Sequence, residues 1–258
     1  MAETEPFGVV YERYALGHCL NKIVDKYKIK TVLEMPAGGA KAAPSLYSLD
    51  LALAGCKVTL VNGNSKSLRF YKDLGVEENV EFIEVDSLHD TYLPSKSYDM
   101  VWNFAFIPTY PEKELLIREM TRLSRGYVSI FSVNRLNIGF PMHRFAHRYA
   151  KVPWTHGDIS YNSPFFLKKF FARNYLKVVE SGVVDCPPWP DSIGFRDIRL
   201  HKSNKDFNCV DWEVPYISCV KVGAPNWVKG LYLLERLPIP LLLKYIYSHI
   251  FYLVGKKA

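Results

Sequence analysis

Three histidines lie close together in the sequence, at positions 143, 147 and 156, and histidine is the side chain best suited to exchanging a proton near neutral pH. His143 and His147 are four residues apart in "HRFAHRY", so on a helix they would share one face. Metal binding needs more ligands than this pair supplies, and we expect no metal ion. A solvated basic helix is the other interpretation of the pair. His156 lies in a loop beside Trp154 in "PWTHGD", and we favour it as a base or substrate contact.

A short apolar run, "VLEMPAGGA" at 32–40, ends in an acid that is followed by small residues. Small side chains at a strand–helix turn let a ligand approach the backbone closely. Glu34 could organise this loop from behind or receive a ligand's ammonium group. Alone, the pattern is weak evidence, because an ordinary tight strand–helix connection has the same composition.

The elements that would position these residues alternate along the chain. Apolar runs predict buried strands at 31–35, 57–62, 79–85, 98–106 and 127–133. Apolar spacing and start or stop residues predict helices at 9–27, from Pro44 to Gly55 and from Pro111 to Gly126. A helix and a strand follow within 165–185, and the last strand is either "VPYISCVKV" or "SHIFYLVGKK". This alternation predicts an α/β fold, with a doubly wound, mostly parallel sheet and helices on both faces.

From about residue 9 to residue 184, the chain resembles the class I S-adenosylmethionine-dependent methyltransferases of the small-molecule type. The matching positions are Glu34, Pro36, Gly38 and Ala40 in the first loop, Asn62 in "LVNGN", Asp86 in "EVDSLH", and the strand "YDMVWNFAF". The resemblance implies a seven-stranded Rossmann-like sheet with a C-terminal appendage, and S-adenosylmethionine as the cofactor. The cofactor-binding residues that it implies are Tyr14, Glu34, Met35, Pro36, Gly38, Asn62, Gly63, Asn64, Asp86, Ser87, Leu88, Asn103 and Phe104.

Two of these positions carry specific expectations. The Asp86 carboxylate would accept a hydrogen bond from the adenine amino group. Asn62 stands where the family usually has an acid that holds the ribose hydroxyls, and a neutral amide would weaken binding by about 1–2 kcal/mol. Tyr14, with Tyr11, belongs to a leading helix that covers the cofactor in many of these enzymes, although either ring could simply pack on the sheet. Neither the G-x-G-x-x-G pattern of nicotinamide-binding proteins nor a phosphate-binding P-loop is present.

Methyl transfer from a sulfonium is an in-line displacement, for which positioning can lower much of the barrier. A general base is needed only if the acceptor must lose a proton, and His156 and His143 are the catalytic candidates. We expect the segment 134–161 to fold over the carboxyl end of the sheet as a substrate wall, with Arg144, Arg148 and His156 facing the cleft and with Trp154 as a further substrate contact. Between residues 134 and 173 there are seven Lys or Arg and one acid, Asp158, against a net charge of +7 for the whole chain.

This charge distribution also bears on the alternatives. A local basic excess favours a carboxylate or phosphate on a small or medium-sized acceptor, whereas nucleic-acid binders usually have a wider basic footprint. The two alternatives are a degenerate methyltransferase fold that serves as a binding or scaffold protein, and a nucleic-acid methyltransferase. Aromatic stretches after residue 220 fit an apolar substrate cover, a homo-oligomer interface or contact with a membrane surface.

The composition sets the remaining expectations. A chain of 258 residues with 48% hydrophobic and 23% charged residues fits one methyltransferase-like domain over 1–258, with an insertion at 134–161 and an aromatic appendage at 220–258. The five cysteines are scattered, which indicates reduced thiols in a cytoplasmic protein. No signal peptide and no apolar stretch long enough to span a membrane are evident in the sequence.

Overall fold

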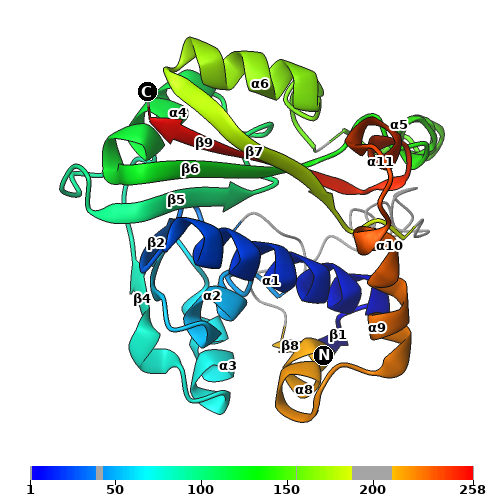
Figure 1. Cartoon of the computed structure of the whole chain (residues 1–258), viewed down its shortest axis with the longest axis horizontal. Helices are drawn as coiled ribbons and strands as arrows, with labels where there is room; N and C mark the ends of the chain where they lie inside the picture. Colours follow the sequence, from blue (N-terminus) through cyan, green and yellow to red (C-terminus); the bar gives the residue numbers. More distant parts are fainter. Residues whose placement is uncertain (1, 39–42, 155, 188–210, 258) are drawn as a thin grey trace.

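A seven-stranded β-sheet forms the centre of the protein in the computed structural model, which describes residues 2–38, 43–154, 156–187 and 211–257 (Figure 1). Its strands, in order across the sheet, are β4 (Val80–Ile83), β3 (Lys57–Val61), β2 (Thr31–Glu34), β5 (Tyr98–Phe104), β6 (Ser124–Val133), β9 (Ile250–Lys257) and β7 (Leu176–Val184). The central strands are continuous apolar runs because helices cover both of their faces. The predicted fold class is confirmed.

The strand β9 is the one strand of this sheet that runs antiparallel to its neighbours, and it lies between β6 and β7. It comes from "SHIFYLVGKK", which settles the choice between the two candidate last strands. The other candidate, "VPYISCVKV", forms the helix α8 (Pro215–Val222), with Pro215 in its first turn. Proline fits the first turn of a helix because the N–H that it lacks would have no partner there.

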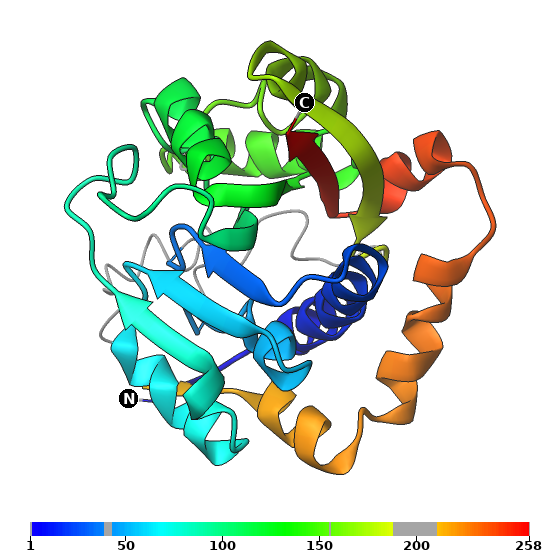
Figure 2. The same cartoon turned by 60° about the vertical axis from the view of Figure 1, so that its left-hand side comes forward.

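Helices cover the two faces of the sheet (Figures 1 and 2). On one face, α1 (Phe7–Tyr27) packs its buried residues against strands β2, β5, β6 and β9, together with the short helices α2 (Leu49–Leu53) and α3 (Leu68–Asp73). On the other face, α4 (Lys113–Leu123) and α6 (Pro164–Arg173) pack against strands β2, β5, β6 and β9. Two single-turn helices, η1 (Ser65–Ser67) and η2 (Glu77–Asn79), flank α3.

Two predicted helix boundaries are wrong. The helix predicted from Pro44 begins only at Leu49, because Ser45 has a left-handed backbone with φ of 62° and its side chain bonds to neighbouring loops. Gly126 does not end a helix. The helix α4 ends at Leu123, and β6 has already begun at Ser124.

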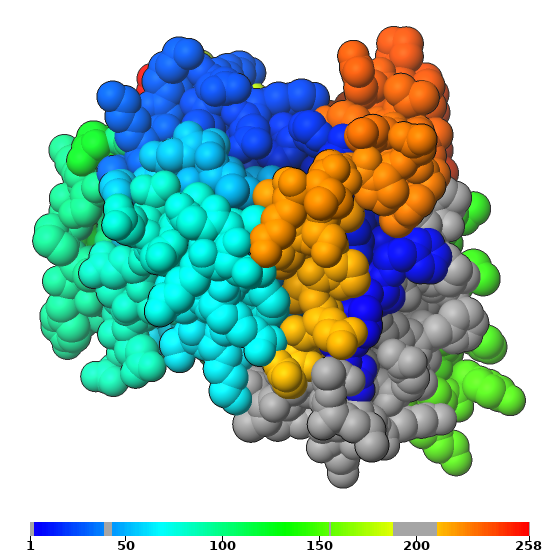
Figure 3. Space-filling view, turned by 90° about the horizontal axis from the view of Figure 1, so that it is seen from below, coloured from blue at the N-terminus to red at the C-terminus, as the bar shows by residue number. Residues whose placement is uncertain are grey.

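The chain after residue 210 wraps around the first helix before it supplies β9 (Figure 3). The short strand β8 (Asp211–Glu213) pairs with β1 (Ala2–Thr4) in a separate two-stranded sheet. The Tyr216 hydroxyl donates to Asp50 in the first turn of α2. The elements that follow are α9 (Asn226–Leu231), α10 (Leu233–Arg236) and α11 (Leu241–Tyr247). Of the helices that the structure describes, none is long and apolar enough to cross a bilayer.

Candidate active site

A cleft of about 480 Å³ opens at the carboxyl ends of β3 and β4. In an open α/β sheet, ligands bind at this edge of the strands. The residues that line the cleft are Asn62, Gly63, Glu84, Val85, Asp86, Thr91 and Tyr92. The structure therefore brings together Asn62, Gly63 and Asp86, which the sequence predicts as contacts for the adenosine portion of the cofactor. Ser87 and Leu88 follow Asp86 directly, and Leu88 packs against the core under α4.

Asn62 joins the ends of β3 and β4 through its side chain. Its Nδ2 donates to the Val85 carbonyl at 3.0 Å, and its Oδ1 accepts from the Val85 N–H at 2.8 Å. The residue has a left-handed backbone with φ of 50°, a conformation that asparagine tolerates better than most residues. An aspartate could not donate to the Val85 carbonyl, so this clamp gives a physical reason for the amide at the position. The two bonds use one donor and one lone pair of that amide.

Glu34 lies behind the first loop. Its side chain is 1% exposed, and its Oε2 accepts from the Ser48 hydroxyl at 2.6 Å. The Trp102 indole donates to the same hydroxyl at 3.1 Å. Burial raises the pKa of Glu34 to about 7, and the Ser48 hydrogen bond partly opposes that shift. Glu34 thus organises the loop from behind, and its carboxylate is too enclosed to receive a ligand's ammonium directly.

The loop after β2 is held by backbone contacts and by one serine. The Ala37 N–H donates to the Val61 carbonyl at 2.8 Å. Ser45 donates to the Ala37 carbonyl and accepts from the Asn64 N–H, both at 2.7 Å. A Cβ at Gly38 would lie 3.6 Å from the Asn62 carbonyl oxygen, which is ordinary contact, so packing within the protein does not require glycine there. Gly38 thus adjoins the Asn62 end of the cleft, while Ala40 lies outside the described residues.

Three further side chains that the sequence predicts at the cofactor make contacts within the protein. Asn103 is fully buried on the α4 side of the sheet, where its Nδ2 lies 3.5 Å from the Met120 sulfur. Phe104 stacks on Tyr47 with ring centroids 4.0 Å apart. Tyr14 contacts the rings of His18 and Tyr232, at 4.5 and 5.5 Å, and so faces the C-terminal segment.

A buried charged side chain, Arg13, lies beneath the loop that follows β2 and was not predicted from the sequence. Arg13 is 2% exposed. Its guanidinium donates to Glu5 Oε1 at 2.8 and 3.1 Å and to the Ala43 carbonyl at 2.9 Å. Its Cζ lies 4.6 Å from the centroid of the Tyr47 ring. A signal was present in the sequence, because Arg13 is four residues after Val9 and three before Leu16, on the buried face of the helix.

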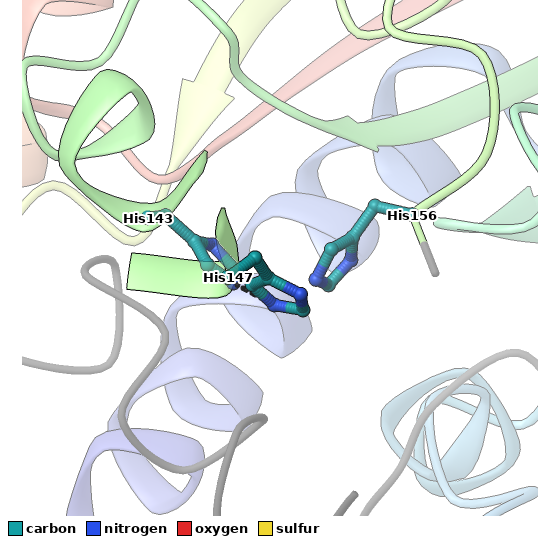
Figure 4. A group of neighbouring side chains, drawn as sticks. All are labelled: His143, His147 and His156. Atoms are coloured by element: carbon teal, nitrogen blue, oxygen red, sulfur yellow. Dashed lines mark hydrogen bonds between the residues drawn. The ribbon is translucent and has the colours of Figure 1, made fainter. Parts of the chain in front are cut away.

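The three histidines form one cluster (Figure 4). His143 and His147 share a face of α5 (Gly139–Tyr149), as predicted, and their Nε2 atoms are 3.1 Å apart. They are 6% and 2% exposed, so the alternative of a solvated helix surface is wrong for them. His156 completes the cluster from the loop that follows, and its ring centroid lies 4.8 Å from that of Trp154. The structure thus supplies the third potential metal ligand that the sequence did not reveal.

The segment 134–161 lies against the loop that follows β5. The Asp158 N–H donates to the Pro108 carbonyl at 2.8 Å. Gly157 has φ of +66°, and a Cβ at this position would collide with the backbone of Pro108 and Thr109. The segment therefore lies near the carboxyl end of β5. Arg144 and Arg148 do not join the histidine cluster, because both side chains are on the exposed side of α5.

A second group of titratable residues, Glu12, Asp185 and His249, lies where β7 ends and β9 begins and was not predicted from the sequence. His249 Nδ1 is 3.0 Å from Asp185 Oδ2 and 3.9 Å from Glu12 Oε2. Asp185 follows β7, and His249 precedes β9, so the antiparallel pairing of these strands brings the two residues together. No sequence pattern links them, because they are far apart in the chain.

The strand order with one reversed strand, and the cleft at the carboxyl ends of β3 and β4, define a class I S-adenosylmethionine-dependent methyltransferase fold. Residues 39–130 match the family model of the methyltransferase domain. No curated protein matches the sequence.

Solved structures agree on the fold. Magnesium protoporphyrin IX methyltransferase from Synechocystis PCC 6803, with bound S-adenosylhomocysteine, is 11% identical with a TM-score of 0.55, over 96% of this chain and 84% of its own. The YcgJ protein from Bacillus subtilis is 15% identical with a TM-score of 0.51, over 93% and 98%. The cyclase SpnF is 12% identical with a TM-score of 0.55, over 93% and 81%. At these identities the likeness concerns the fold alone.

Proposed function

We propose that the protein transfers a methyl group from S-adenosylmethionine to a small or medium-sized organic acceptor and releases S-adenosylhomocysteine. The observation that carries this proposal is the cleft in the methyltransferase domain, where Asp86 and Gly63 lie at the ends of neighbouring parallel strands. In this arrangement the Asp86 carboxylate accepts from the adenine amino group. The Asn62 amide and the backbone near Gly63 face the ribose, and the loop around Gly38 faces the methionine portion.

Replacing Asp86 by alanine should weaken the binding of S-adenosylhomocysteine by about 10–100-fold, because a hydrogen bond to a charged group is worth about 1.5–3 kcal/mol. Isothermal titration calorimetry measures the effect directly. Asp90→Ala is the matched control, since Asp90 is an exposed acid near the cleft that does not line it. The adenine placement is wrong if Asp86→Ala binds as tightly as the wild type. The whole function fails if the wild type binds neither S-adenosylmethionine nor S-adenosylhomocysteine at millimolar concentration.

The acceptor site belongs, in this proposal, to the segment 134–161. Trp154 packs between the histidines, and Arg144 Cζ lies 6.0 Å from the centroid of its ring. Cationic side chains at this end of the sheet suit an acceptor that carries a carboxylate or phosphate. Because His156 lies beside Trp154, it is the candidate base for an acceptor that must lose a proton.

Arg144→Ala should raise the KM for the acceptor by about tenfold and leave the affinity for S-adenosylhomocysteine unchanged, since one charge-assisted contact is lost. The acceptor itself can be found by incubating a metabolite extract with methyl-labelled S-adenosylmethionine and identifying the labelled product by mass spectrometry. Lys169→Ala on α6 serves as a control that removes an equal charge outside the segment. Unchanged kinetics in Arg144→Ala would remove this residue from the acceptor site.

One observation favours a second candidate function, a binding protein or an enzyme of different chemistry on the same fold. The Asn62 amide is engaged with the Val85 backbone, and a cyclase is among the proteins of similar fold. Tight binding of S-adenosylmethionine without methyl transfer to any component of the extract would support this candidate. The nucleic-acid alternative predicts binding to RNA or DNA that weakens steeply with salt.

A further inference from the structure

We propose that His143, His147 and His156 bind a single zinc ion. Their ligand atoms all lie within 4.8 Å of one another (Figure 4). The Nε2 atoms of His143 and His147 are 3.1 Å apart. Two nitrogens that bind tetrahedral zinc at 2.0–2.1 Å would be separated by about 3.3 Å, so these two rings need almost no movement to share an ion.

The hydrogen bonding of His147 prepares its ring for a metal. Its Nδ1 lies 3.0 Å from the Pro153 carbonyl oxygen. A carbonyl can only accept, so Nδ1 carries the proton, and in the neutral ring Nε2 then presents a lone pair. That lone pair points toward His143 Nε2. Metal-binding histidines in proteins are typically oriented in this way, by a carbonyl or carboxylate on the far nitrogen.

Trp154 holds His156, the third ligand, beside His143 and His147. Trp154 contacts all three imidazole rings, with centroid distances of 5.4, 5.3 and 4.8 Å to His143, His147 and His156. Its indole N–H donates to the Gly157 carbonyl at 3.1 Å, which ties the loop that carries His156 to the same tryptophan.

The donor set indicates which metal would bind. The cluster consists of imidazole nitrogens without a carboxylate, and imidazole suits zinc and other late transition metals, whereas magnesium and calcium prefer oxygen ligands. Two of the rings are buried, which limits competition from water.

Within the described part of the chain the cluster supplies three of the four ligands of tetrahedral zinc. The cluster belongs to the segment that contacts Pro108 after β5, at the same end of the sheet as the cofactor cleft. We assign to the fourth position a carboxylate oxygen, a hydroxyl oxygen or a thiolate sulfur of the methyl acceptor. This assignment rests on the proposed function, whereas the zinc site itself does not.

The test measures metal binding without activity. Purified full-length protein is treated with a chelator, exchanged into metal-free buffer and titrated with zinc by calorimetry, in the absence of S-adenosylmethionine. The wild type should bind one zinc ion, and His156→Ala should bind it at least tenfold more weakly. His249→Ala is the matched control, because the group of Glu12, Asp185 and His249 is the other cluster of potential ligands in the described part of the chain. Loss of zinc in His249→Ala with retention in His156→Ala would overturn the assignment, as would a wild type that binds no zinc.

A second measurement needs no variant. X-ray absorption spectroscopy at the zinc edge of the loaded wild type should show three imidazole ligands, and a site with fewer would overturn the proposal.

Zinc should also raise the Tm of the wild type and of His249→Ala but not that of His156→Ala, because an ion that binds only the folded chain stabilises it. If zinc binds as expected but no methyl transfer occurs, the site stands and the proposed function fails.

Discussion

Replacing Arg13 by leucine should lower the free energy of unfolding by about 3–5 kcal/mol, the cost of breaking a buried ion pair. Burial lowers the pKa of Arg13, but the Glu5 carboxylate together with Tyr47 and Glu12 raises it by more, so the guanidinium stays charged. Glu5 is 3% exposed, and without Arg13 its carboxylate would be buried with no compensating charge from this pair. Urea unfolding followed by circular dichroism measures the loss.

Two comparisons show whether the effect comes from the buried pair. The double variant Arg13→Leu with Glu5→Leu should be less destabilised than the sum of the single variants, because neither charge is left behind. Arg69→Leu removes a pair with Asp211 whose side chains are 50% and 67% exposed, and it should cost less than about 1 kcal/mol. A loss below about 1 kcal/mol in Arg13→Leu would show that the guanidinium does not support the fold in this way.

Replacing Glu34 by glutamine should stabilise the cofactor-free protein at pH 8 by up to about 3 kcal/mol relative to the wild type. The pKa of Glu34 in the folded protein is about 7, against an ordinary value of 4.5. Between these values the folded chain keeps the proton that the unfolded chain loses, so stability falls as pH rises from about 4.5 through about 7. Glutamine stays neutral at every pH and can still accept from Ser48.

The measurement is the difference in unfolding free energy between Glu34→Gln and the wild type at several pH values. That difference should be near its minimum below pH 4.5 and should grow until about pH 8. Glu119 provides an opposite control. Burial raises its pKa, but hydrogen bonds from Arg122 and Thr91 lower it by more, so Glu119→Gln should cost stability at neutral pH. A flat difference for Glu34→Gln across this range would mean that its carboxyl titrates normally.

The features that could be predicted from the sequence are those that depend on residues close together in the chain. Apolar runs predicted the central strands because helices cover both faces of the sheet there, and Asp86 was predicted from the resemblance to the methyltransferase family. The helical pair of His143 and His147 followed from spacing alone. These features depend on neighbours in the chain, which a single sequence displays directly.

The remaining features depend on contacts between distant segments. His156 reaches the other histidines because Gly157 lets the loop pack against Pro108, and no local pattern reports such a contact. The pairing of the Asn62 side chain with the backbone of Val85, beside the neighbouring strand, was likewise not evident from the sequence. "VPYISCVKV" is rich in β-branched and aromatic residues, which are typical of strands, yet Pro215 lies in the first turn of a helix that ends before Gly223.

The place of β9 in the sheet has a consequence for synthesis on the ribosome. Because β9 lies between β6 and β7, the strand β7 cannot reach its position until about 65 further residues have been made, which takes about 3–13 s at ordinary translation rates. During that interval the nascent chain carries β6 with an unpaired edge, and such edges invite aggregation. The sheet therefore closes only after β9 has been made, and until then the edge of β6 is open to pairing with another chain.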